Sequence, residues 1–344
     1  TASDLRNFDS MKKMLQHAIL AACLFALPWG TRALAEKPAG FDSGLQLFVQ
    51  QMADEHDFDR DWLRETMQQI VYRQDIIDAI SRPAEAKPWH QYRPIFVTQA
   101  RATEGAAFWE ANASLLQRAE AEYGVPAEII VAIIGVETRY GRHKGKYPVL
   151  DALGTLAFGY PKRSRFFRSE LEQFLLLARE EQVDPTVALG SYAGAMGQPQ
   201  FIASSYRNYA VDFDGDGRRD LQNSTADSIG SVAAYFKRHG WRRGAPVTSR
   251  ARGVGREHRH FIEAGMKPSL TIGELAAAGI EPELDDLPAD AMSSLIELQG
   301  TEASEYWLGL DNFYVITRYN HSNLYAMAVY QLSREILALR EQRG

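Results

Sequence analysis

The stretch Val131-Ala-Ile-Ile-Gly-Val-Glu-Thr-Arg-Tyr-Gly-Arg-His143 decides how this chain folds, because it predicts an apolar helix that ends by presenting one carboxyl group. Pro126 suits the first turn of such a helix, since the N–H groups of that turn have no partner within the helix in any case. Glu128 complements the positive end of the helix dipole, and Gly141 is the expected stop. Glu137 is therefore expected near the end of the helix.

Glu137 is expected to share a helix face with aliphatic side chains. The residues that recur at the three- and four-residue spacing of that face are Ile130, Ile133 and Ile134. Desolvation there raises the pKa of a carboxyl, so that it can hold a proton near neutral pH and give it to a leaving group, as a general acid must. Spacing alone leaves a second interpretation open, in which Arg139 or Arg142 neutralises a structural Glu137.

The composition is that of an ordinary globular protein: 344 residues, 24% charged and 45% hydrophobic, with a formal net charge of -6. The length allows two or three cores. No stretch reaches the roughly 20 consecutive apolar residues that a membrane span requires. The acidic balance argues against a nucleic-acid partner.

Residues 11–35 have the features of an export signal: a basic start, a short apolar middle and a small-x-small ending at Ala33-Leu34-Ala35. Met11 is then the expected start, with residues 1–10 an upstream extension. Leu20-Ala-Ala-Cys23 also resembles a lipoprotein cleavage box, in which Cys23 would carry the lipid. Either processing leaves a mature chain without a free cysteine thiol, so its core must stabilise it without disulfides.

The rest of the chain is predicted to be mainly helical, with one β-containing insertion. Two apolar stripes between residues 42 and 80 are interpreted as core: Leu45, Phe48, Val49 and Met52 in the first, and Trp62, Met67, Ile70 and Val71 in the second. Residues 166–182 predict an amphipathic helix, and residues 244–310 show short alternating runs, such as 292–298, that predict strands. Residues 312–321 also alternate like a strand.

Two further segments have a polar composition that allows a structural or a functional interpretation. The basic run at 237–260 is either a solvated loop or a patch for an anionic polymer. Residues 191–201, SYAGAMGQPQF, combine two glycines with Ser191, Gln198 and Gln200 among small apolar residues. The glycines predict either a tight packing crossing or a wall of a ligand site, where the backbone of this chain can approach the ligand closely.

The segment Asp212-Phe-Asp-Gly-Asp-Gly-Arg-Arg-Asp220 has the oxygen spacing of a calcium-binding hand, with carboxylates at loop positions 1, 3, 5 and 9 and glycine at position 6. Position 12 is Asn223 instead of the usual Glu, so Asp227 would have to supply the last ligand from a longer loop. The alternative is an acidic turn that binds nothing.

Read together, four motifs resemble the lytic murein transglycosylase B family of bacterial cell-wall enzymes. They are Gly135-Val-Glu-Thr-Arg-Tyr-Gly141, Gly194-Ala-Met-Gly-Gln-Pro-Gln-Phe201, the aspartate loop and Thr317-Arg-Tyr-Asn-His-Ser322, in that order. The resemblance covers nearly all of the chain after the signal. It implies an α+β, mainly α fold in which a lysozyme-like core (109–243 and 311–344) carries a helical domain (36–108) and a small β-containing insertion (244–310), with a peptidoglycan groove between the domains.

The resemblance also implies the chemistry. Glu137 would protonate the glycosidic oxygen between N-acetylmuramic acid and N-acetylglucosamine, and then act as base on the muramyl 6-hydroxyl, which closes onto C1 as a 1,6-anhydro ring. Calcium would be held by Asp212, Asp214, Asp216, the Arg218 carbonyl and Asp227, and no organic cofactor is expected. Substrate contacts would come from Ser191 and Asn320 near the broken bond, from the wall residues Met196, Gln200 and Phe201, from the groove tyrosines Tyr92, Tyr235, Tyr319 and Tyr325, and from the basic pair Lys162 and Arg163.

The expected partners are peptidoglycan glycan strands and, as candidates, wall-synthesis proteins. The protein is expected to be a monomer in the periplasm. The alternative is attachment to the outer membrane by a lipid anchor at Cys23. Two other functions fit the same residues. A muramidase would hydrolyse the same bond with water, and a non-catalytic wall-binding protein would use Glu137 structurally. The chain offers no second acid in a comparably apolar motif, which favours a mechanism with one carboxyl.

Overall fold

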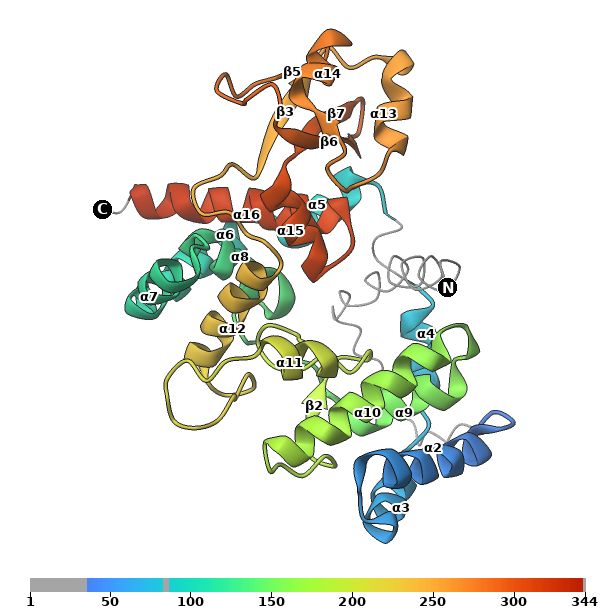
Figure 1. The fold of residues 1–344 in the computed structure, drawn as a ribbon. Coiled ribbons are helices and arrows are strands. Elements are labelled where there is room, and N and C mark those ends of the chain that lie inside the picture. Colours follow the sequence, from blue (N-terminus) through green and yellow to red (C-terminus); the bar gives the residue numbers. More distant parts are fainter. Residues whose placement is uncertain (1–35, 83–86, 343–344) are drawn as a thin grey trace. The chain divides into compact units, whose positions relative to one another are not determined.

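The computed structural model describes residues 36–82 and 87–342, which form two compact units (Figure 1). The first unit contains residues 87–140 and 232–342, and the second contains residues 36–82 and 141–231. Helices dominate and strands are few, which confirms the predicted α+β, mainly α class. The domain boundaries after residues 108, 243 and 310 remain a prediction.

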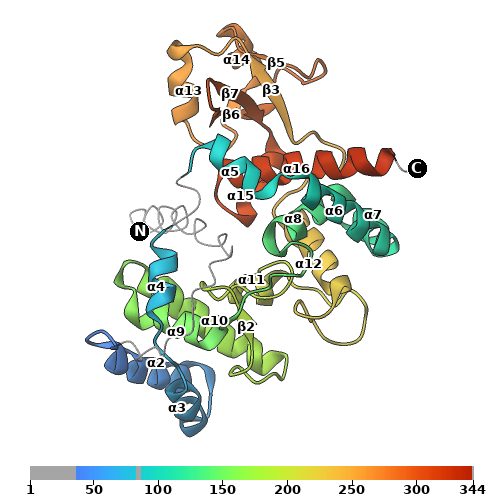
Figure 2. The same cartoon turned by 180° about the vertical axis from the view of Figure 1, so that it is seen from behind.

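The second unit is helical apart from one short strand pair (Figure 2). Its elements are α2 (Phe41–His56), α3 (Arg60–Gln68), α4 (Gln74–Ile80), β1 (Tyr147–Pro148), α9 (Val149–Gly159), the 3₁₀ turn η2 (Pro161–Arg163), α10 (Ser164–Glu180), β2 (Leu189–Gly190) and α11 (Ala203–Tyr209). The amphipathic helix predicted at 166–182 is confirmed as α10, whose apolar side packs on α9. Helix α12 (Thr225–Arg238) runs from the second unit into the first.

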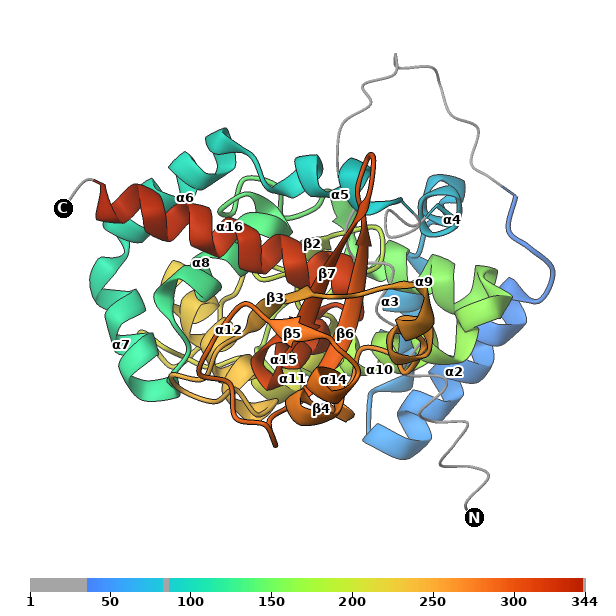
Figure 3. The same cartoon turned by 90° about the horizontal axis from the view of Figure 1, so that it is seen from above.

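The first unit combines helices with the main sheet, which Figure 3 shows from above. Its helices are α5 (Trp89–Phe96), α6 (Gln99–Ala111), α7 (Ala113–Tyr123), α8 (Ala127–Thr138), η3 (Arg256–His258), α13 (Arg259–Glu263), α14 (Ile272–Ala277), α15 (Asp311–Tyr319) and α16 (Asn323–Glu341). Its strands are β3 (Thr248–Arg252), β4 (Leu270–Thr271), β5 (Glu281–Pro282), β6 (Met292–Gln299) and β7 (Ser304–Gly309).

The predicted Glu137 helix is α8, and it is buried on every side. Each residue from Ile129 to Thr138 is buried, because α6, α7 and α16 all pack against this helix. The expectation of one aliphatic face was therefore too narrow. A helix that is apolar all round, as α8 is before Glu137, is suited to the centre of a core.

Helix α8 ends earlier than predicted, because the two residues that follow it adopt the left-handed backbone conformation although neither is glycine. The helix stops at Thr138, and Arg139 and Tyr140 follow with φ of 50° and 61°. The Tyr140 ring folds back onto α8, where a Cβ on Gly135 would lie 2.6 Å from its hydroxyl oxygen. The same hydroxyl donates to the Arg101 carbonyl at 2.8 Å. Gly135 therefore makes room for the residue that ends the helix.

The five strands form an antiparallel sheet in the order β4-β6-β7-β3-β5, all within residues 248–309. The β6–β7 hairpin pairs Leu295 with Leu308, and both side chains enter a small core with Ile272, Leu275, Ile280 and Leu310. The strand predicted at 292–298 is confirmed as β6. The sheet thus has an apolar core of its own.

The prediction of a strand at residues 312–321 is wrong, because this segment forms α15. Phe313, Ile316 and Tyr319 are buried at three-residue spacing, which is the spacing of a helix face. The Asn312 side chain accepts from the Arg242 N–H at 2.8 Å and donates to the Arg242 carbonyl at 2.9 Å, which holds the start of the helix. Packing has overridden the strand propensity of the β-branched residues.

Only two of the four residues in the second predicted core stripe are buried. Met67 and Ile70 are buried, but Trp62 is 40% exposed and Val71 is 38% exposed. Helix α3 ends at Gln68, so the four residues do not share one helix, and Trp62 lies in its first turn beside the fully buried Leu63.

The basic run at 237–260 contains several ion pairs. Arg250 pairs with Glu305 at 3.1 Å, Arg252 with Glu283 at 3.2 Å and Arg259 with Glu263 at 3.1 Å. These acidic neighbours neutralise much of the charge that a patch for an anionic polymer would need. Part of the run forms β3 and η3, so a solvated loop does not describe all of it either.

Substituting Gly135 tests how α8 is terminated. Gly135→Ala should lower the free energy of unfolding by about 1–3 kcal/mol, because the added methyl group overlaps the Tyr140 ring. In a Tyr140→Ala background the same substitution should be neutral or stabilising by up to about 1 kcal/mol, since alanine favours a helix more than glycine does. Urea unfolding of the four proteins measures both effects. Equal destabilisation in both backgrounds would contradict this account.

Candidate functional site

Glu137 lies in the last turn of α8 with its side chain buried, the residue being 9% exposed. Its Oε1 accepts a hydrogen bond of 2.6 Å from the Tyr325 hydroxyl. Burial disfavours the ionised carboxylate, whereas a donor aimed at it favours that form. The two effects act in opposite directions on the balance between the protonated and the ionised form of this carboxyl.

Tyr325 owes its position to the start of α16. Ser322 caps this helix, and its Oγ accepts from the Tyr325 N–H at 3.3 Å. The Tyr325 side chain is fully buried. Burial raises its pKa well above the ordinary value for tyrosine, and the charge of Glu137 raises it further. The phenol therefore stays protonated at any pH near neutrality and remains a donor to Glu137.

Two more tyrosines pack beside this pair. The Tyr319 ring lies parallel to the Tyr325 ring with centroids 6.4 Å apart, and Tyr235 meets Tyr319 edge to face at 4.9 Å. The Tyr235 hydroxyl donates to the Arg318 carbonyl at 2.6 Å. Burial, followed by the charge of Glu137, raises the pKa of Tyr319 well above its ordinary value. These contacts make a rigid aromatic cluster around the carboxyl.

The structure bears on the alternative in which Arg139 neutralises Glu137. Arg139 directs Nε and one terminal nitrogen to the two carboxylate oxygens of Glu104, at 2.7 and 2.8 Å. This two-point, charge-assisted pair gives Arg139 a carboxylate partner other than Glu137. Glu104 was missed by the sequence analysis, because it is 35 residues away in the chain and belongs to no motif.

Asn320 and Tyr92 also belong to the first unit and are buried. Asn320 follows α15 directly in extended conformation. Tyr92 lies on α5 between the rings of Trp89 and Phe96. The first unit thus carries the expected catalytic residue, Asn320 and the four tyrosines expected in the groove, all of them 9% exposed or less.

The second unit carries the remaining expected substrate contacts, beginning with the loop at 191–201. Met196 and Phe201 exchange backbone hydrogen bonds of 2.8 and 3.0 Å. Ser191 Oγ accepts from the N–H of Ala195 at 3.1 Å, and Gln200 Nε2 donates to the Gly197 carbonyl at 2.9 Å. The polar side chains therefore stabilise the loop itself.

The glycines of this loop mark the tight packing crossing that the sequence allowed. A Cβ on Gly194 would lie 2.5 Å from Leu153, and a Cβ on Gly197 would overlap the Leu221 carbonyl. Both glycines have positive φ, of 79° and 74°. This crossing sets the path of the backbone between Ser191 and Phe201, whichever ligand the loop contacts.

The basic pair Lys162 and Arg163 lies in the 3₁₀ turn η2. Lys162 is exposed, whereas the Arg163 guanidinium lies over Phe166 and Phe167, 4.9 and 5.1 Å from their ring centroids. Burial lowers the pKa of Arg163, but arginine remains charged at neutral pH. Lys162 is thus the more accessible charge of the two.

The aspartate loop brings three carboxylates together. Oxygen atoms of Asp212, Asp214 and Asp227 all lie within 4.8 Å of one another, and Asp227 is 1% exposed in the first turn of α12. Burial raises the pKa of Asp227, the backbone N–H donors of Phe213 and Asp220 lower it, and the charge of Asp214 raises it. Oxygen ligands grouped in this way suit a hard cation such as Ca²⁺.

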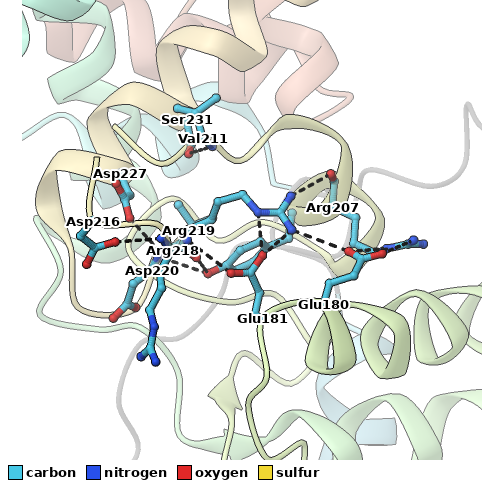
Figure 4. A network of polar contacts seen from close by, with 12 residues as sticks. Glu180, Glu181, Arg207, Val211, Asp216, Arg218, Arg219, Asp220, Asp227 and Ser231 are labelled. Carbon is cyan, nitrogen blue, oxygen red and sulfur yellow. Dashed lines mark hydrogen bonds and ion pairs between the residues drawn. The ribbon is translucent and has the colours of Figure 1, made fainter. Parts of the chain in front are cut away.

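Backbone N–H groups hold the loop in shape (Figure 4). Asp227 accepts from Asp220 at 2.7 Å, and Asp216 accepts from Arg218 at 2.8 Å. Asp216 is outside the group of three carboxylates found in the described part of the chain. Asn223, at the twelfth loop position, donates to Asp220 at 3.0 Å.

Ion pairs attach this loop to the neighbouring helices. Figure 4 shows Arg219 of the loop on Glu181, with Nε 2.6 Å from the carboxylate, and Arg207 of α11 on Glu180 at the end of α10. The hydrogen bond from Arg207 is the largest cause that lowers the pKa of Glu180. The loop, α10 and α11 are therefore connected by charge-assisted hydrogen bonds.

Comparison with known proteins agrees with this geometry. The model of a family described as "Transglycosylase SLT domain" matches residues 40–334. The chain belongs to the lytic transglycosylase family. It is 45% identical over 307 residues to membrane-bound lytic murein transglycosylase B of Escherichia coli K12, covering 86% of this chain and 83% of that protein. The enzymes of this family cleave peptidoglycan.

Solved structures of lytic transglycosylases share the fold. SltB1 of Pseudomonas aeruginosa is 52% identical with a TM-score of 0.82, covering 86% of this chain and 99% of its own. Slt35 of E. coli, solved in complex with calcium, is 45% identical with a TM-score of 0.79, covering 87% and 94%. SltB3 of P. aeruginosa, solved with NAG-anhNAM-pentapeptide, is 29% identical with a TM-score of 0.76, covering 87% and 80%. The expected lysozyme-like lytic transglycosylase fold is confirmed.

The variant Tyr325→Phe tests the hydrogen bond within this lytic transglycosylase. It keeps the ring and removes the donor, and a hydrogen bond to a charged group contributes about 1.5–3 kcal/mol, so kcat should fall roughly 10- to 100-fold. Without the donor the ionised carboxylate is less stable, so the alkaline limb of the pH–rate profile should move to higher pH. Tyr330→Phe, on the same helix, is the matched control and should leave the profile in place. An unchanged profile for Tyr325→Phe would rule out this role.

Proposed function

We propose that Glu137 is the single catalytic carboxyl with which this lytic transglycosylase cleaves the β-1,4 bond between N-acetylmuramic acid and N-acetylglucosamine. The observation that carries the proposal is the buried Glu137 carboxyl with a permanently protonated tyrosine, Tyr325, as its donor. Glu137 gives its proton to the glycosidic oxygen as the bond from that oxygen to the muramyl C1 breaks. The resulting carboxylate is stabilised by the Tyr325 hydrogen bond until it takes a proton back.

The proton that Glu137 takes back comes from the muramyl 6-hydroxyl, whose oxygen then bonds to C1. No water enters, and the product is a 1,6-anhydro ring. Ordinary glycosidases use two carboxyls, about 5 or 6.5–9.5 Å apart. A tethered hydroxyl has a high effective concentration, so a single acid that later acts as base suffices. The anhydro sugar in the SltB3 complex supports the same product for this chain.

We propose further that the substrate contacts inferred from the resemblance apply to this chain. Ser191 and Asn320 are assigned to the sugars at the broken bond, and Lys162 to the glycan or its peptide. Their polar groups lie in or beside loops whose backbones are held by hydrogen bonds and tight packing, which supports a preorganised role. Tyr325 and Tyr92 are fully buried, so we assign Tyr325 to orienting Glu137 and Tyr92 to the packing around it.

The variant Glu137→Gln tests the assignment of the acid. The amide keeps the shape but donates no acid proton, so turnover of purified sacculi should fall about 10²–10⁴-fold while the thermal unfolding midpoint stays near that of the wild type. Products of the wild type should end in 1,6-anhydromuramic acid, which mass spectrometry separates from the hydrolysed form by one water. Products dominated by reducing-end muramic acid, or labelled by oxygen from water, would instead favour a muramidase.

We infer that Asp212, Asp214 and Asp227 hold Ca²⁺, with Asp216 and the Arg218 carbonyl as the further ligands expected from the resemblance. The fit rests on the three clustered oxygens and on the buried Asp227, beside which Asp214 is a like charge. A divalent cation would neutralise that repulsion and brace the loop that Arg219 ties to Glu181. The calcium complex of the Slt35 relative supports the same ion here.

Calcium should stabilise the folded protein and leave the reaction that it catalyses unchanged. An ion at 100 times its Kd adds about 2.7 kcal/mol of stability if only the folded state binds it. The melting temperature should therefore fall on chelation in the wild type. Asp214→Ala should abolish this difference, whereas Asp216→Ala should keep a larger part of it, because Asp216 lies outside the group of three. Identical melts of the wild type with calcium and with chelator would reject the site.

We propose that the enzyme acts on peptidoglycan strands in the periplasm, as a monomer, with wall-synthesis proteins as candidate partners and no nucleic acid. The predicted export signal at 11–35 and the lipid-anchor alternative at Cys23 lie outside the described residues. Among the helices of residues 36–82 and 87–342, none is both long and apolar enough to cross a membrane.

A further inference from the structure

The second unit has a hollow of about 330 Å³ with an exposed indole at its side. Trp62 contributes the indole and is 40% exposed. Ala178 and Val183 contribute apolar atoms, while Asp57, Asp59 and Gln182 contribute polar ones. This volume lies in the range of small-molecule sites, roughly 300–1,000 Å³. None of these residues belongs to the motifs assigned to catalysis or calcium.

The Trp62 ring is held in a fixed position although it faces solvent. The Asp59 carboxylate accepts from the Trp62 backbone N–H at 2.7 Å, which caps α3 and holds the backbone that carries the indole. The Phe58 ring stacks on Trp62 with an interplanar angle of 8° and centroids 5.8 Å apart. The Arg179 guanidinium lies 4.2 Å from the centroid of the Phe58 ring. A ligand that packs on the indole would therefore lose little side-chain entropy.

Packing within the fold does not account for the exposed part of the Trp62 ring. Its neighbour Leu63 and the later Met67 bury the core face of α3, and both are fully buried. The indole stacks on Phe58, which is 8% exposed with this cover in place, yet Trp62 itself remains 40% exposed. A rigid, exposed aromatic side chain of this kind is a common feature of binding sites.

A second hollow, of about 420 Å³, adjoins the first and shares Ala178 and Val183 with it. It continues past Val187 and Leu189 to Met196, one of the wall residues expected to contact substrate. The described residues include eight exposed large hydrophobic side chains, and four of them line these two hollows: Trp62, Val183, Val187 and Leu189. Such clustering marks an interaction site, whereas scattered exposed residues need no explanation.

The chemistry of the two hollows selects an uncharged ligand with one apolar face. The C–H bonds of a pyranose ring form such a face and pack on an indole, while carboxylates and amides accept hydrogen bonds from its hydroxyl groups. Carboxylates (Asp57, Asp59 and Asp184) and guanidinium groups (Arg179, Arg218 and Arg219) both line the hollows, so a polymer with a dense charge of either sign would meet like charges there. A polysaccharide backbone satisfies both conditions.

We propose that the hollow beside Trp62 is an accessory site for the glycan backbone of peptidoglycan, with one sugar ring packed on the indole and the strand continuing along Val183 and Val187 toward Met196. The proposal rests on the proposed function only for the identity of the polymer. Its role would be to retain the long insoluble substrate during repeated cleavage.

The test measures binding in the Glu137→Gln background, which prevents digestion of the probe. Protein is pelleted with purified sacculi, and soluble uncharged β-1,4-linked N-acetylglucosamine oligomers, or the free stem peptides, are added as competitors. Trp62→Ala should weaken binding about three- to tenfold, as the loss of an aromatic contact predicts. Trp62→Phe should recover part of this loss. Leu47→Ala is the matched control, since Leu47 is 66% exposed on α2 and lines neither hollow.

Competition by the N-acetylglucosamine oligomers, reduced in the Trp62→Ala protein, is the expected result. Equal binding of Trp62→Ala and Leu47→Ala, or competition by stem peptides alone, would overturn the proposal. Thermal melts show whether each variant is folded. The proposed function is judged separately, by the anhydro product of the wild type, so either can fail without the other.

Discussion

A single hydrogen bond, from the Tyr325 hydroxyl to the Glu137 carboxyl, connects the two helices around which the first unit is built. Helix α8 provides the acid and α16 provides the donor, and these helices pack directly against each other. Because both side chains are buried, the bond operates without competition from water and its geometry is set by the packing of the core. The chemistry of the site therefore depends on the same contacts that stabilise the fold.

The end of α8 shows how closely the backbone is adapted to this arrangement. Arg139 and Tyr140 adopt left-handed conformations that cost free energy at residues other than glycine. The Arg139–Glu104 pair and the Tyr140 hydroxyl bond to Arg101 compensate that cost. Gly135 leaves the space into which Tyr140 folds. Strain at the end of the helix thus coincides with the last turn that presents Glu137.

The second unit uses carboxylates for structure. In the aspartate loop the backbone N–H groups point inward to Asp212 and Asp227, which concentrates negative charge at one place and prepares it for a cation. Outside the loop, Glu180 and Glu181 receive arginines from α11 and from the loop. Carboxylates of this unit are therefore held either by backbone N–H groups or by arginines, according to which donors surround them.

The sequence by itself determined the helix that carries Glu137, the aspartate loop, the β6 strand and the family, because each depends on local spacing or on motifs a few residues long. It could not determine the strand-or-helix choice at 312–321, since an apolar segment with the β-branched residues Val315, Ile316 and Thr317 is compatible with both and only packing selects α15. Nor could it show that Trp62 faces solvent, because an apolar residue at helical spacing has the same pattern whether or not a neighbour covers it. Tertiary structure alone decided the partners of Glu137 and Arg139. Tyr325 is 188 residues from Glu137, and no local pattern encodes a contact over that separation.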